Sequence, residues 1–207
     1  MVALTIAGTV AAFNYIDDQT NNALSSYAKH RFETAADYVT NGAWKKLVSK
    51  TNEKLKGKTI EQDPNLEFVD EILEKTKLQT DDKLLDLWAS LLANAMQGKN
   101  SIRREYFDIL SKLNPYDVLT LNMIMDDILR KNIVGLRRNG LVSTFTTAQM
   151  DQLSEIIDSH YGLDIKSTDF RISLLYLQKL ELISNASDPN NWTLTLSGNG
   201  LKEALTV

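Results

Sequence analysis

The chain of 207 residues contains no cysteine, only three prolines and only nine glycines. Without cysteine it forms neither a disulfide nor a thiolate metal site, and it has no thiol nucleophile. This composition is typical of a protein from a reducing compartment, so we expect a cytoplasmic location. Because proline and glycine interrupt regular structure, their scarcity also predicts long regular elements.

Histidine is scarce as well, since the chain has two, His30 and His160, far apart in the sequence. A histidine-based catalytic triad or metal site needs further partners at suitable spacing. Adjacent aspartates occur at 17–18, 81–82 and 126–127. Neighbours on a helix point about 100° apart, so such a pair does not share one site. The sequence therefore predicts no enzyme active site, no cofactor and no metal.

One short segment, Gly57-Lys58-Thr59, is similar to the end of a phosphate-binding loop. That motif also needs a glycine five residues before Gly57, and the residue there is Asn52. The motif should follow a buried strand, whereas this tripeptide follows a lysine-rich segment. We therefore do not interpret it as a nucleotide-binding site.

Charge is unevenly distributed along a chain whose net charge is −4, a balance that does not favour a nucleic-acid-binding protein. Residues 44–58 carry six lysines and one glutamate, whereas residues 61–86 carry nine carboxylates and three lysines. We expect the two segments to attract each other within the fold or between protomers. The alternative is a basic surface for anionic lipid or nucleic acid that includes Lys45, Lys46, Lys50 and Lys54.

The first 13 residues are mostly small and apolar. They are too few to span a bilayer, which needs about 20 apolar residues. They also lack the basic residues that open a signal peptide. We expect a helix start that packs on the core or on a partner, with weak association at a membrane surface as the alternative.

Residues 83–96 give the strongest structural signal of the chain. Their apolar side chains cover more than half of a helix circumference: Leu84, Leu85, Leu87, Trp88, Leu91, Leu92, Ala95 and Met96. A helix that is apolar nearly all round is a central one, packed against several neighbours. Trp88 is then a core anchor, and the amide of Asn94 needs a hydrogen-bond partner inside the fold.

Other helices are predicted from apolar spacing and end signals. Residues 16–55 form one or two long helices with a break near Asn41-Gly42, and a short helix covers 66–78. Thr80 or Asp81 caps the central helix and Gly98 ends it. Ser101 begins a helix that reaches Leu113, Asn114-Pro115 begins one that continues through Ile128, and another runs from 146 or 147 to near 162.

The last forty residues differ in character, because a helix at 170–180 precedes two short strand-like runs at 182–183 and 192–196. A turn at 188–191 joins these runs, and a helix at 197–205 closes the chain. This order is similar to a winged helix. Its candidate recognition helix has only two cations, Arg171 and Lys179. The basic cluster near this module is Arg130, Lys131, Arg137 and Arg138. DNA binding is possible but disfavoured, because affinity for DNA depends on cationic contacts to phosphate.

Several runs of this sequence resemble the Abi-alpha (abortive infection alpha) family of bacterial proteins. They are Leu84–Met96, Tyr106–Leu110, Leu113–Asp117, Ser173–Ile183 and Leu194–Gly198. The resemblance covers about residues 60–204; in its closing motif related sequences tend to have proline where this chain has Leu196. It implies a role in phage defence but no catalytic residue. Trp88 and Asn94 belong to the family motif, and we favour a structural role for both.

Together these observations predict a mainly α-helical protein with long N-terminal helices, a helical central region and a winged-helix-like C-terminal module with a short β-hairpin. We expect an N-terminal helical region at 1–59 and an Abi-alpha-like domain at 60–207, of which 114–207 form the winged-helix-like part. The favoured function is non-enzymatic defence through contacts with a phage or host protein, with a homo-oligomer possible. A DNA-binding regulator and a membrane-surface effector are the alternatives.

Overall fold

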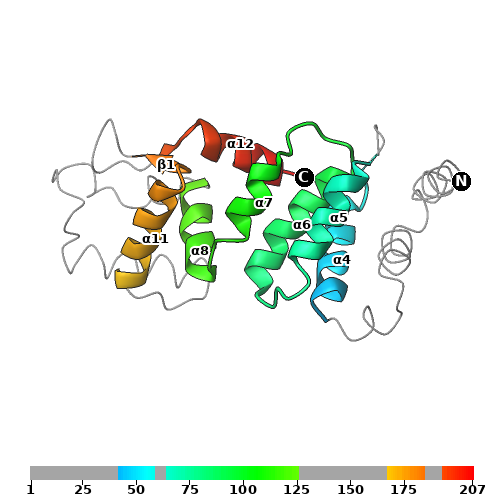
Figure 1. Cartoon of the computed structure of the whole chain (residues 1–207), viewed down its shortest axis with the longest axis horizontal. Coiled ribbons are helices and arrows are strands. Elements are labelled where there is room, and N and C mark those ends of the chain that lie inside the picture. The colour runs from blue at the N-terminus through cyan, green and yellow to red at the C-terminus, as the bar shows by residue number, and fades with distance from the viewer. Residues whose placement is uncertain (1–41, 59–63, 126–166, 185–192) are drawn as a thin grey trace, which may run out of the picture. The chain divides into compact units, whose positions relative to one another are not determined.

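The computed structural model describes residues 42–58, 64–125, 167–184 and 193–207. Within these ranges the chain forms seven helices and one antiparallel pair of two-residue strands (Figure 1). The predicted mainly α-helical class is therefore confirmed. The described residues belong to two compact units: one holds the residues up to Lys112 together with Glu203–Val207, and the other holds Leu113–Lys202.

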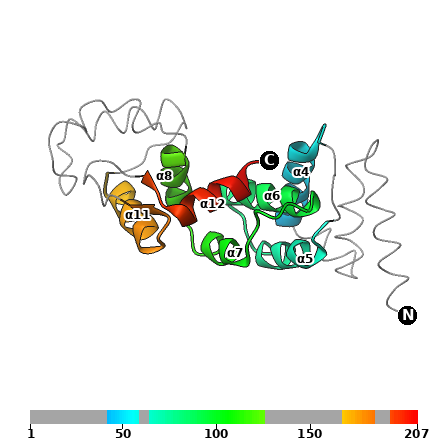
Figure 2. The ribbon, with the colours of Figure 1, turned by 90° about the horizontal axis from the view of Figure 1, so that it is seen from above.

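The first unit is built around α6 (Asp82–Met96). This helix packs against α4 (Gly42–Leu55), α5 (Leu66–Lys75) and α7 (Arg104–Leu110), as Figure 2 shows from above. Every residue from Leu84 to Met96 except Asp86 is buried. The prediction of a central helix packed on several sides is confirmed.

Both ends of α6 follow from local chemistry. Asp81 caps the start, because its Oδ1 accepts hydrogen bonds from the backbone N–H groups of Lys83 and Leu84 at 3.0 and 2.9 Å. Gly98 follows the last turn with φ +67°, a left-handed conformation that glycine adopts without strain. Both end signals were predicted from the sequence.

Aromatic side chains fill the core between these helices. Trp88 is 1% exposed, and its ring lies 6.1 Å from that of Phe107, which makes an edge-on contact with Phe68 at 5.4 Å. Trp44 on α4 is fully buried, and its indole Nε1 donates a hydrogen bond of 2.9 Å to the Leu73 carbonyl. Buried rings with satisfied polar atoms stabilise such a core strongly.

Several predicted helix boundaries were wrong; α7, for example, ends at Leu110 and not at Leu113. The short helix ends at Lys75, not Leu78: Thr76 is its C-cap, with the hydroxyl donating to the Ile72 carbonyl at 2.8 Å, and Leu78 lies beyond it, exposed. Ser101 does not cap α7, which begins at Arg104 after an extended Arg103. The reason is that Ile102 is buried in the non-helical segment before the helix, so its hydrophobicity did not indicate a helical position.

The second unit contains α8 (Pro115–Met125), α11 (Ser167–Lys179), β1 (Ile183–Ser184), β2 (Thr193–Leu194) and most of α12 (Leu196–Leu205). Asn114 caps α8 as predicted: its Oδ1 accepts from the N–H groups of Tyr116 and Asp117, and Asp117 Oδ2 accepts from the Asn114 N–H at 2.9 Å. This reciprocal pair is a capping box.

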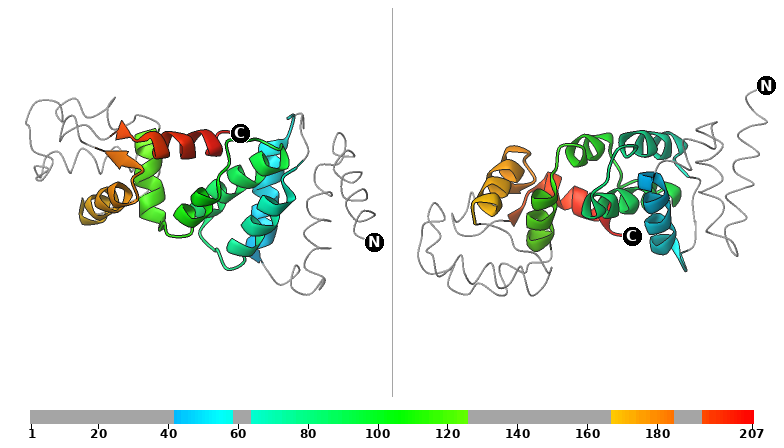
Figure 3. Two further views of the ribbon diagram at one scale, coloured as in Figure 1. Left: turned by 45° about the horizontal axis from the view of Figure 1, so that its top comes forward. Right: turned by 90° about the horizontal axis from the view of Figure 1, so that it is seen from below.

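Helix α8 lies beside α11 and packs against it (Figure 3). The strands pair Ile183 with Leu194 and Ser184 with Thr193. Gly198 in α12 lies directly against the Leu182 backbone. A Cβ at this position would sit 2.0 Å from the Leu182 carbonyl oxygen, so a larger residue does not fit without a shift. The predicted hairpin is present, while its turn at 188–191 lies outside the described residues.

Other predictions also fall outside the described residues: the N-terminal helices before residue 42, the continuation of α8 beyond residue 125 and the helix at 146–162. The winged-helix arrangement therefore stays a prediction.

Candidate functional site

Asn94 is fully buried in α6 and ties this helix to the C-terminal segment. Its Nδ2 donates to the carbonyls of Ala204 at 2.8 Å and Thr206 at 3.1 Å. The last carbonyls of a helix have no partner within the helix, so an external donor there is stabilising. Lys99 Nζ adds a third donor, 3.3 Å from the Thr206 carbonyl. These contacts support the structural interpretation of Asn94.

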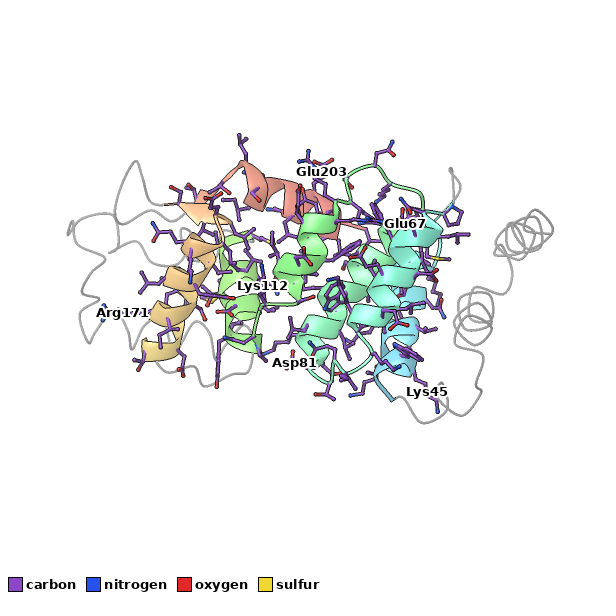
Figure 4. All side chains as sticks on the ribbon, viewed as in Figure 1. Lys45, Glu67, Asp81, Lys112, Arg171 and Glu203 are labelled. Carbon is purple, nitrogen blue, oxygen red and sulfur yellow. The ribbon has the colours of Figure 1, made fainter. Side chains whose placement is uncertain are left out.

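The lysines of α4 predicted as a basic surface face carboxylates of α6. Lys46 pairs with Asp82 at 3.1 Å, while Lys50 and Lys54 pair with Asp86 at 3.7 and 3.1 Å. The attraction of the basic and acidic segments within the fold is therefore observed. Lys45 lies exposed near the start of α4 (Figure 4). Because three of the four lysines already lie against carboxylates, the positive potential of this surface is reduced.

A second group of ion pairs joins α5 to α7. Lys75 Nζ lies 2.9 Å from Asp108, and Arg104 pairs with Glu67 and, at 3.4 Å, with Glu71. The hydrogen bond and positive charge of Lys75 lower the pKa of Asp108 below its usual value. Exposed pairs of this kind stabilise a fold only weakly. They join two helices and present no reactive group.

The predicted basic cluster of Arg130, Lys131, Arg137 and Arg138 lies outside the described residues. Its role as an interaction surface stays a prediction.

The most unusual surface of the described chain is one side of α11. Its inner side buries Phe170, Leu174 and Leu177. On the opposite side Ile172 is 58% exposed and Leu175 is 62% exposed. We call this side the α11 outward face; its exposed residues are Thr168, Arg171, Ile172, Leu175, Gln178 and Lys179. Arg171 projects from α11 away from α8 in Figure 4.

Sequence reasoning missed this face because it considered the two cations of the helix and not the positions of its apolar residues. A signal was present: at about 100° per residue, Ile172 and Leu175 fall on the side opposite Phe170, Ser173 and Leu177. A helix with apolar residues on two sides has one side left for a second contact.

Comparison with known families decides the membership of the chain. The model of the family described as Abortive infection alpha matches residues 40–197, most of the sequence. The chain belongs to this family. The match extends from just before α4 to the first residues of α12, so it includes Trp88, Asn94 and the α11 outward face. No curated protein and no solved structure matches the chain.

Among the described helices, none combines the length and the hydrophobicity that crossing a membrane requires. In the same residues, no group of three His, Asp or Glu side chains is placed to hold a metal ion. Family membership suggests a role in abortive infection, and the α11 outward face is the candidate functional surface.

Proposed function

We propose that this protein is a non-enzymatic anti-phage defence protein that acts as a sensor or effector by contacting another protein. Membership of the abortive infection family supports the defence role. One structural observation carries the mechanism: Ile172 and Leu175 stand side by side on the α11 outward face, each more than half exposed. Adjacent exposed aliphatic side chains of this size mark a surface that gains from being covered.

The free energy gained by covering these two side chains has the size expected for a transient contact. Burying a whole leucine or isoleucine side chain stabilises by about 1.5–3 kcal/mol, so covering the exposed parts of these two gives about 2–3 kcal/mol. A few residues with contributions of this size dominate most protein interfaces. The α11 outward face can therefore form the centre of a small interface.

The same face is a poor match for DNA. A specific DNA-binding protein typically makes about 6–10 phosphate contacts, whereas this face offers two cations with two aliphatic side chains between them. Membrane-surface binding through α4 is also disfavoured, because Lys46, Lys50 and Lys54 lie against carboxylates. Protein contact is the function that these residues support best.

A phage challenge tests the proposal. A sensitive bacterium expressing the wild-type chain is expected to give fewer plaques with at least one of a diverse set of phages than the same strain with an empty vector. The double variant Ile172→Ser, Leu175→Ser is expected to lose this protection. Leu78→Ser removes a leucine that is 88% exposed in the first unit and is expected to keep it.

Two results count against the proposal. Unchanged plaque counts for the wild-type chain across the phage set contradict the defence role. Full protection by a stably expressed double variant contradicts the mechanism through the α11 outward face. Equal cellular levels of all variants, measured by immunoblot, ensure that protection and not abundance is compared.

A further inference from the structure

The exposed residues of α11 combine aliphatic groups with charge of one sign. At about 100° per residue, the six exposed side chains fall within an arc of roughly 120° with Leu175 at its centre. Ile172 and Lys179 lie on one flank of Leu175, and Arg171 lies on the other. The α11 outward face therefore presents two large apolar side chains bracketed by two cations.

Carboxylates are absent from this arc. The acidic residue within α11, Asp169, is only partly exposed and lies about 60° outside the arc. Lys179 consequently gives the face a positive charge, although the whole chain carries a net charge of −4. A partner gains most when it covers the aliphatic pair and places negative charge near the cations.

A second copy of this chain does not meet that requirement. If two α11 helices met face to face in antiparallel orientation, Arg171 of one copy would lie near Lys179 of the other. In parallel orientation each cation would lie near its own equivalent. Like charges brought together across an interface cost affinity, so the complementary partner is a different molecule.

DNA and anionic lipid are also negatively charged, but they fit the centre of the face poorly. Leu175 occupies the middle of the arc, and along the helix axis Ile172 and Leu175 lie between Arg171 and Lys179. A phosphate backbone would place its densest charge against these aliphatic groups and leave them against a polar surface. A protein segment instead supplies apolar and acidic side chains in the same alternation.

We propose that the α11 outward face binds an amphipathic protein segment whose apolar residues are flanked by aspartates or glutamates. This inference deepens the proposed function and rests on it, because it names the chemistry of the partner. Lys179 selects the acidic residues, while Ile172 and Leu175 supply the apolar contact. The partner is a helix or extended segment that becomes ordered on this face.

A library of random peptides displayed on their own mRNA provides the test. The full chain is the bait, and the double variant Ile172→Ser, Leu175→Ser removes peptides that bind elsewhere. The retained peptides are expected to combine apolar residues with an excess of aspartate and glutamate. The best retained peptide is expected to bind Lys179→Glu about tenfold more weakly than wild type, which is one close charge interaction of about 1.4 kcal/mol. Lys45→Glu, a charge reversal on exposed α4, is the matched control and is expected to leave its affinity unchanged.

Several outcomes overturn the inference. The first is that the retained peptides show no excess of aspartate and glutamate. The second is that no peptide depends on the α11 outward face for binding. The third is that the best retained peptide binds wild type and Lys179→Glu with equal affinity. Binding of a DNA duplex or of vesicles containing anionic phosphatidylglycerol that is lost in the Ile172→Ser, Leu175→Ser variant also overturns it. If the peptides lack acidic residues but the double variant still loses phage protection, the proposed function stands and only the partner chemistry fails.

Discussion

Replacing Asn94 with alanine tests whether this buried amide is structural or functional. The side chain is fully buried, and its Nδ2 donates to two carbonyls of the C-terminal segment at 2.8 and 3.1 Å. Each hydrogen bond contributes about 0.5–1.5 kcal/mol, and a buried carbonyl left without a donor adds about 1–3 kcal/mol. Because Ala204 is itself buried, we expect Asn94→Ala to lower the free energy of unfolding by about 3 kcal/mol.

Thermal unfolding followed by circular dichroism measures this effect. For a chain of this size, a loss of about 3 kcal/mol lowers Tm by roughly 6–12 °C. Asn52→Ala is the control: Asn52 is a second buried asparagine of the first unit, and its Oδ1 accepts no hydrogen bond. We expect a cost below about 1 kcal/mol for that variant.

If Asn94 is purely structural, Asn94→Ala lowers phage protection only to the extent that it lowers the fraction of folded protein. An Asn94→Ala protein that keeps the wild-type Tm but gives no protection refutes this structural role, and Asn94 would then act in recognition. An unchanged Tm with full protection also refutes it, because the two hydrogen bonds would then contribute nothing to stability.

Three further predictions concern stability. Gly198→Ala should destabilise the second unit by about 2 kcal/mol or more, because its Cβ would overlap the Leu182 carbonyl; chemical denaturation checks this, and a wild-type midpoint contradicts it. Since Lys75 lowers the folded-state pKa of Asp108, this carboxylate contributes stability that is present above its unfolded pKa and is lost as pH falls through the lower folded value. Asp108→Asn should therefore flatten the acid limb of a stability-against-pH curve, and an identical acid limb rules this out. Thr120 is fully buried with a hydroxyl that has no hydrogen-bond partner, so Thr120→Val should leave Tm unchanged or raise it; a clear decrease would show that the hydroxyl is bonded in solution.

The helices that the sequence predicts best are those whose ends carry their own chemistry. Asp81 and Gly98 bound α6, and Asn114 with Asp117 starts α8, all through short-range contacts that sequence spacing reveals. The predicted start of α7 was wrong because Ile102 is buried in a non-helical segment. Burial of that residue depends on tertiary neighbours, which apolar spacing does not contain.

The candidate site shows the same limit. The charge of the α4 lysines and of Asp82 and Asp86 indicated attraction, but the sequence did not say which lysine meets which carboxylate. For α11, the sequence predicted a helix, and only the packing against α8 decides that Leu175 faces outward. The helical periodicity of the sequence therefore places Ile172 and Leu175 on one side of α11. Only the fold shows that this side is exposed.

A photo-crosslinking amino acid in place of Leu175 tests the central claim most directly. The substituted protein is illuminated in living cells before and after phage infection, and a copy with the same group in place of exposed Glu53 on α4 is the control. We predict a discrete protein adduct from position 175 that is absent from position 53 and whose crosslinked peptide contains apolar and acidic residues. A protein that still protects its host but forms no such adduct, or forms one with DNA, would contradict the account.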